Sequence, residues 1–145
     1  MPNHVFLGFD FGMRRIGVAV GQTLTHSAKP IAVLKARHGL PRWEAIQTLI
    51  DTWAAEGLVI GIPYDLDGTE QPMTVAACQF VHELQSRFKL PVYTIDERLT
   101  TVEAKRHRRY ARQQQTESFP ALDSYAAKLI LEQWLQESHH SGLLP

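Results

Sequence analysis

Short apolar runs alternate with polar turns along the chain and predict a mixed α/β protein. Three runs near the start, at residues 5–9, 16–20 and 31–34, predict a meander of three strands. Two later runs, at 58–62 and 91–95, predict strands that each follow a helical segment. The predicted order is three strands, two helix–strand pairs and two final helices. Such an order gives a mixed sheet with helices covering its faces.

Four helices are predicted from apolar spacing and from start signals. Residues 46, 49, 50 and 53 are apolar, and this spacing places them on one face of a helix over 41–56. A second amphipathic pattern runs over 73–88. The Thr-x-x-Glu sequence at 100–103 predicts the start of a third helix, and Pro120 predicts the start of the last one.

Length and composition are those of one globular domain. The 145 residues are 44% apolar and 21% charged, and we expect a single domain over 1–138 with a C-terminal tail over 139–145. Fifteen Lys and Arg balance fifteen Asp and Glu, which excludes a global attraction to nucleic acid or membrane. The single cysteine excludes an internal disulfide. Because no apolar run is long enough to span a bilayer and no signal peptide is apparent, we expect a cytoplasmic protein without membrane partners.

Carboxylates stand at three places where a site can form. Asp10 directly follows the first apolar run, and Asp96 and Glu97 follow the fifth. Asp123 shares a helix face with Ala126 and two other apolar residues. Each position alone also fits a turn, surface or capping acid.

Together these acids favour a metal site. Adjacent and parallel first and fifth strands would bring Asp10 to Glu97 or Asp96, and the last helix would add Asp123. Carboxylates so close repel one another, and a divalent cation removes the conflict. Ligation by oxygen alone favours Mg²⁺ or Mn²⁺, and two such ions can activate water for phosphodiester cleavage.

Motifs spread along nearly the whole chain resemble one protein family. The segments are Leu-Gly-Phe-Asp-Phe-Gly at 7–12 with Arg-Ile-Gly-Val-Ala-Val at 15–20, Val-Ile-Gly-Ile-Pro at 59–63, Asp-Glu-Arg-Leu-Thr-Thr at 96–101, and Leu-Asp-Ser-Tyr-Ala-Ala at 122–127. They are similar to the YqgF (RuvX) family. The resemblance implies an α/β, ribonuclease H-like fold with a five-stranded mixed sheet of order 3-2-1-4-5 flanked by helices. In that order the two acidic strands share a cleft edge without being neighbours.

The resemblance also implies an activity and its residues. The family's catalytic and metal-binding acids correspond to Asp10, Glu97 and Asp123, with Mg²⁺ or Mn²⁺ as cofactor. The implied function is a metal-dependent endonuclease in 5′-end processing of pre-16S ribosomal RNA, acting as a monomer or homodimer with ribosomal assembly partners. The chain departs from the family pattern at 21–22, where Gly-Gln replaces Ser-Asp, and at 119–121, where no lysine precedes the last acid.

Cations near these acids are candidate nucleic-acid contacts. They are Arg14, Arg15, Arg98, Lys105, Arg106, Arg108 and Arg109. A solvated helix face is the alternative explanation for the cluster at 105–109.

Three other functions remain open at this point. A Holliday junction resolvase would act on branched DNA and would need a dimer, so that two strands are cut symmetrically. The Asp-x-Gly sequence at 10–12 also occurs in the ATPase and sugar-kinase branch of this fold, which uses a second domain that 145 residues do not supply. A non-catalytic RNA-binding protein is the third alternative.

Overall fold

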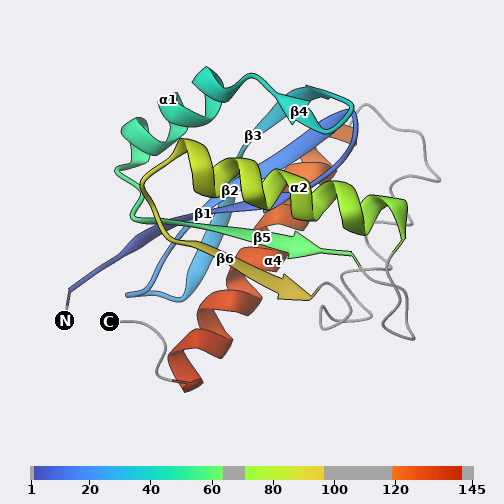
Figure 1. Cartoon of the computed structure of the whole chain (residues 1–145). Helices are drawn as coiled ribbons and strands as arrows, with labels where there is room; N and C mark the ends of the chain where they lie inside the picture. Colours follow the sequence, from blue (N-terminus) through green and yellow to red (C-terminus); the bar gives the residue numbers. More distant parts are fainter. Residues whose placement is uncertain (1, 64–70, 97–118, 142–145) are drawn as a thin grey trace.

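One mixed sheet with helices on both faces forms the protein (Figure 1). The computed structural model describes residues 2–63, 71–96 and 119–141. The elements in chain order are β1 (Val5–Asp10), β2 (Arg15–Gln22), β3 (Ser27–Arg37), β4 (Leu40–Pro41), α1 (Trp43–Trp53), β5 (Gly57–Ile62), α2 (Pro72–Arg87), β6 (Val92–Asp96) and α4 (Phe119–Ser141). The helix expected from residue 100 lies outside the described residues.

The sheet has the order β4-β3-β2-β1-β5-β6. The five longer strands therefore lie in the predicted order 3-2-1-4-5, which confirms that expectation. The sixth strand, β4, was not predicted. Its two residues pair with the end of β3 after a tight turn in which His38 and Gly39 have φ of 53° and 79°.

The central strand β1 is antiparallel to β2 and parallel to β5, and β5 is parallel to β6. The carboxyl ends of β1, β5 and β6 therefore meet at the same edge of the sheet. Because β5 lies between the other two, β1 and β6 are not neighbours. The expectation that the first and the fifth predicted strands are adjacent is therefore wrong. The shared edge implied by the resemblance is correct.

Two apolar cores lie on the two faces of the sheet. Helices α1 and α2 cover one face, and α4 covers the other (Figure 1). On the α4 face the buried residues are Phe6, Ala19, Val59, Ile95, Ala127, Ile130, Leu131, Trp134 and Leu135. In the part of the chain that the structure describes, no helix is both long and apolar enough to span a membrane.

Glycines on β1 and β2 let α4 approach the sheet closely. A Cβ atom added at Gly8 would lie 2.7 Å from the Cβ of Leu131, and one added at Gly17 would overlap the backbone carbonyl of Asp123. Real Cβ atoms do not tolerate such contacts, so only a strand without side chains here can receive the helix.

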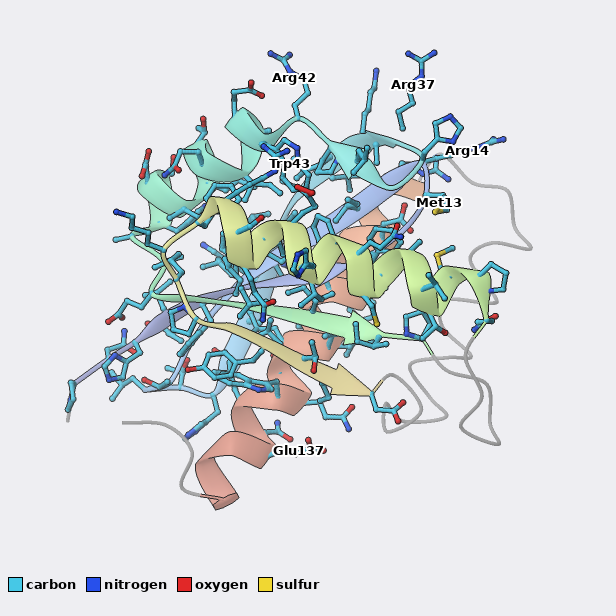
Figure 2. All side chains as sticks on the ribbon, in the orientation of Figure 1. Met13, Arg14, Arg37, Arg42, Trp43 and Glu137 are labelled. Carbon is cyan, nitrogen blue, oxygen red and sulfur yellow. The ribbon has the colours of Figure 1, made fainter. Side chains whose placement is uncertain are left out.

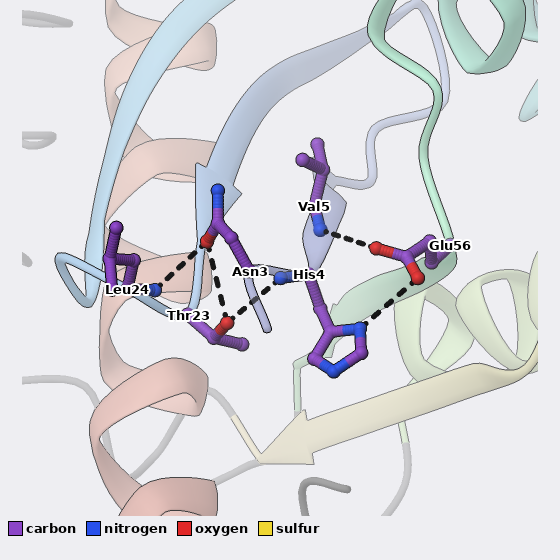
Figure 3. A network of polar contacts seen from close by, with 6 residues as sticks. All are labelled: Asn3, His4, Val5, Thr23, Leu24 and Glu56. Atoms are coloured by element: carbon purple, nitrogen blue, oxygen red, sulfur yellow. Dashed lines mark hydrogen bonds and ion pairs between the residues drawn. The ribbon is translucent and has the colours of Figure 1, made fainter. Parts of the chain in front are cut away.

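A polar network joins the start of β1 to the residues before β5 (Figure 3). Glu56 accepts a hydrogen bond of 3.1 Å from the Val5 amide, and its other carboxylate oxygen lies 3.1 Å from Nδ1 of His4. Thr23 and Asn3 extend the network toward the turn after β2. The side-chain hydrogen bond from His4 holds the pKa of the Glu56 carboxyl below its ordinary value of 4.5.

We predict that Gly17→Ala destabilises the protein. The added methyl group would overlap the Asp123 backbone, and overpacking of this kind costs about 1–3 kcal/mol. Urea unfolding measures the loss. Thr94→Ala, at an exposed position of β6, is the control and should cost less. Equal stability of Gly17→Ala and the parent protein would contradict the tight docking of α4.

We predict that Glu56 makes the stability depend on pH in the acid range. Because its pKa is lower in the folded state, the unfolded chain binds the proton more tightly, so this stabilisation is present above pH 4.5 and is lost as the pH falls below it. Thermal unfolding at a series of pH values should show a shallower acid loss for Glu56→Gln. Glu44→Gln, with the same charge change at an exposed site in α1, should retain the parent slope.

Candidate functional site

Asp10 occupies the middle of a row of residues that crosses the α4 face of the sheet. Its partners in the register are Gly17 on β2 and Gly61 on β5, and Gly61 in turn pairs with Ile95 on β6. Phe6, Gly8 and Asp10 alternate onto this face, because successive strand residues point to opposite sides. Asp10 therefore lies on the same side of the sheet as α4.

The Asp10 carboxylate is buried, with only 6% of the residue exposed. Both of its cross-strand neighbours are glycines, so neither adds a side chain beside it. A buried carboxylate requires compensating cations, donors or a metal ion to remain ionised. Asp10 is therefore a buried acid with no side chain at either cross-strand position.

Asp123 is brought to the same place by α4. Its backbone packs directly on Gly17, and Gly17 is the cross-strand partner of Asp10. The Asp123 side chain is 17% exposed. The last helix therefore passes over β2 at the residue that pairs with Asp10, on the same face of the sheet.

Arg15 forms an ion pair with Asp123, which the sequence analysis did not predict. The Nε atom of Arg15 lies 3.3 Å from Oδ2 of Asp123. Arg15 is on the same sheet face as Gly17, two residues earlier in β2, and is therefore diagonal to Asp10. Its guanidinium neutralises part of the negative charge that the two acids bring together.

Arg14 takes a different position from Arg15. It lies in the loop between β1 and β2, is exposed, and points outward next to Met13 (Figure 2). It is available for a ligand that approaches this end of the molecule.

The structure describes one of the two alternative acids at the end of β6. Asp96 pairs with Ile62, which belongs to the core under α1 and α2. Asp96 is therefore on the sheet face opposite Asp10. Glu97 lies outside the described residues, as do the predicted cations Arg98, Lys105, Arg106, Arg108 and Arg109.

The donor set suits a hard divalent cation but is incomplete within the described residues. These residues contain no group of three or more His, Cys, Asp or Glu that could hold a metal ion. Asp10 and Asp123 supply carboxylate oxygens only, the ligands that Mg²⁺ and Mn²⁺ prefer.

The comparisons with known proteins place the chain in a family. The family model described as "RuvX: Holliday junction resolvase" matches residues 4–137. The chain belongs to the RuvX family. A Coxiella burnetii relative, named as a candidate pre-16S rRNA nuclease, is 62% identical over 139 residues that cover 94% of this chain and 97% of the relative. A Legionella pneumophila relative with the same name is 47% identical over 138 residues, which cover 95% and 99% of the two chains.

Solved structures with little sequence identity support the RuvX fold. RuvC of T. thermophilus, in complex with a Holliday junction substrate, superposes with a TM-score of 0.57 at 15% identity over 96% of each chain. The fowlpox virus Holliday junction resolvase gives 0.53 at 11% identity over 92% of this chain and 99% of its own. At these identities the likeness establishes the ribonuclease H-like fold and nothing finer.

The glycines beside Asp10 are the features of the site that the sequence analysis missed. Gly17 lies one position after Ile16, inside a strand that was recognised, and Gly61 lies inside another. The signal at Gly17 was present, because a glycine inside a strand often marks the close approach of another backbone.

We predict that Mn²⁺ raises the melting temperature of the protein through the two acids. At a hundredfold excess over its dissociation constant, a bound ion adds about 2.7 kcal/mol of stability. Asp10→Asn and Asp123→Asn should reduce this metal-dependent shift in differential scanning fluorimetry. Asp96→Asn, which removes a carboxylate from the opposite face, should retain it. If Asp96→Asn lost the shift while Asp10→Asn and Asp123→Asn retained it, the metal site would lie on the other face of the sheet.

Proposed function

We propose that this chain is a metal-dependent endonuclease that hydrolyses phosphodiester bonds in pre-16S ribosomal RNA. The observation that carries the proposal is the convergence of Asp10 and Asp123 on one face of the sheet. The names of the Coxiella and Legionella relatives support the substrate, since each match covers nearly all of both chains. We place the reaction in the cytoplasm and assign it to one domain over residues 1–138.

Asp10, Glu97 and Asp123 would hold the cation. The choice of Glu97 over Asp96 rests on strand alternation, because Asp96 is on the face opposite Asp10. Bound Mg²⁺ or Mn²⁺ would supply an activated water and charge stabilisation for the leaving oxygen, as in phosphodiester cleavage by such ions.

The surrounding residues have separate roles in this proposal. Asp10 is fixed by the central strand, which is paired on both sides. Arg15 orients Asp123 through their ion pair. Exposed Arg14 contacts a substrate phosphate. The same role is proposed for Arg98, Lys105, Arg106, Arg108 and Arg109.

A Holliday junction resolvase is the second candidate, favoured by the description of the matching family model. Symmetric cleavage of a junction requires two active sites related by a two-fold axis, and therefore a homodimer. The same acids would serve both substrates, so the substrate and the oligomeric state separate the two functions.

We predict that cleavage of a pre-16S leader RNA requires Mg²⁺ or Mn²⁺ and both acids. Asp10→Asn and Asp123→Asn should lower kcat/KM at least about a hundredfold, the scale on which removal of a preorganised charge slows a reaction. Gel analysis of a labelled leader measures the rate.

Asp96→Asn is the matched control for these variants and should cleave at close to the parent rate. Parent activity in Asp10→Asn would refute the catalytic assignment. Cleavage of a synthetic four-way junction without cleavage of the leader would identify the resolvase instead.

A further inference from the structure

A stretch near the start of the chain carries a large positive charge within a neutral protein. Residues 11–43 contain six Lys and Arg and no Asp or Glu, whereas the whole chain has fifteen of each charge. The six cations are Arg14, Arg15, Lys29, Lys35, Arg37 and Arg42. This run of positive charge lies on β2, β3 and β4 and on the segments that adjoin them.

Three of these cations, Arg15, Lys35 and Arg37, share the sheet face of Asp10. Lys35 pairs with Arg15 in the register of β2 and β3. The alternate residues Leu34 and Ala36 pack in the core beneath α1 and α2, so Lys35 and Arg37 are on the α4 face. Both are exposed.

Hydrogen bonds hold this end of β3 against the loop that follows β1. The Ala36 amide donates to the carbonyl of Arg14 at 2.8 Å, and the Gly39 amide donates to the carbonyl of Met13 at 2.9 Å. Arg42 then directly follows β4 and occupies the N-cap position of α1, where its side chain makes no capping hydrogen bond. Figure 2 shows Arg14, Arg37 and Arg42 projecting outward at this one end of the molecule.

We propose that four residues, Arg14, Lys35, Arg37 and Arg42, bind the phosphodiester backbone of the substrate. We call them the basic edge. The inference rests on the proposed nuclease function and adds a contact surface on the β3 side of Asp10, opposite the side of β6. It assigns substrate binding to three residues, Lys35, Arg37 and Arg42, beyond the cations named above for that role.

Three other cations of the described chain have partners within the protein. Arg15 pairs with Asp123, Arg87 pairs with Glu83, and Lys29 lies 4.9 Å from the ring centre of Trp53. Within the described ranges, no member of the basic edge forms an ion pair. Their charges therefore face solvent. A nucleic acid that binds there would exchange its condensed counterions for these side chains.

The distance between Lys35 and Asp10 fits a nucleic-acid strand that runs past Asp10 and Asp123. Lys35 stands two strands from Asp10, and strands lie about 4.8 Å apart, so the separation across the sheet is about 10 Å. The rise per nucleotide along the axis of a duplex is about 3.4 Å, so a backbone that passes Asp10 can reach Lys35 within a few nucleotides. The basic edge thus binds phosphates beside the scissile one. Because backbone contacts carry no sequence information, it raises affinity without choosing the sequence.

Binding measured in a cleavage-deficient protein tests the proposal. The Asp10→Asn protein, without added divalent cation, is titrated with labelled single-stranded RNA and with duplex DNA of the same sequence at several salt concentrations. Adding Lys35→Gln and Arg37→Gln should weaken binding. It should also reduce the slope of log affinity against log salt by about 1.4 for RNA and 1.8 for duplex DNA.

A matched control carries Lys29→Gln and Lys89→Gln in the same Asp10→Asn background. Both lysines are exposed; Lys29 is on the α1 side of the sheet, and Lys89 lies between α2 and β6. This protein has the same net charge as the test variant and should retain the parent slope. Thermal unfolding checks that both proteins are folded.

Each outcome decides the inference separately from the nuclease function. An unchanged slope in the Lys35 and Arg37 variant, or an equal loss in the control, overturns the basic edge while leaving cleavage by the parent protein untouched. Absence of both binding and cleavage in the parent protein overturns the proposed function as well. If the slope falls only with RNA, the basic edge binds an RNA backbone. If it falls only with DNA, the basic edge binds a DNA backbone. A lower slope with both supports recognition of the phosphodiester chemistry that they share.

Discussion

The contact between α4 and the glycines of β1 and β2 is the constraint on which the site depends. Gly8 and Gly17 remove the side chains that would hold the helix away from the sheet. Farther along the helix, Trp134 packs its ring 5.0 Å from that of Phe6, measured between ring centres, which fixes the other part of α4. Close packing at both places determines where Asp123 stands relative to Asp10, so the electrostatics of the site follow from the packing.

Much of the sheet could be predicted because its central strands are apolar on both faces. The strand β3 was predicted too short, at 31–34, whereas it runs over Ser27–Arg37. Its ends carry Lys29, Lys35 and Arg37, and such polar ends look like turns in a search for apolar runs. The short strand β4 could not be predicted, because its pairing depends on the positive φ angles of the preceding turn.

The acids Asp10 and Asp123 could be selected from a strand end and a helix face, but their surroundings required the register. The ion pair of Arg15 with Asp123 depends on where α4 crosses β2, which local patterns do not encode. The positive charge at Lys35 and Arg37 is present in the sequence, but a net charge of zero averages over regions of opposite sign and hides it. Glu97 lies outside the described residues, so its place in the site stays a prediction.

The contact of the last helix with the first strands has a consequence for biosynthesis. A ribosome produces β1 to β6 before it produces α4, and N-terminal parts of a chain can begin to fold first. Until α4 emerges, the nascent chain has Asp10 without Asp123, and the apolar residues Phe6, Val59 and Ile95 on that face lack their cover. An enzyme arranged in this way cannot assemble its pair of carboxylates before its own translation is nearly finished.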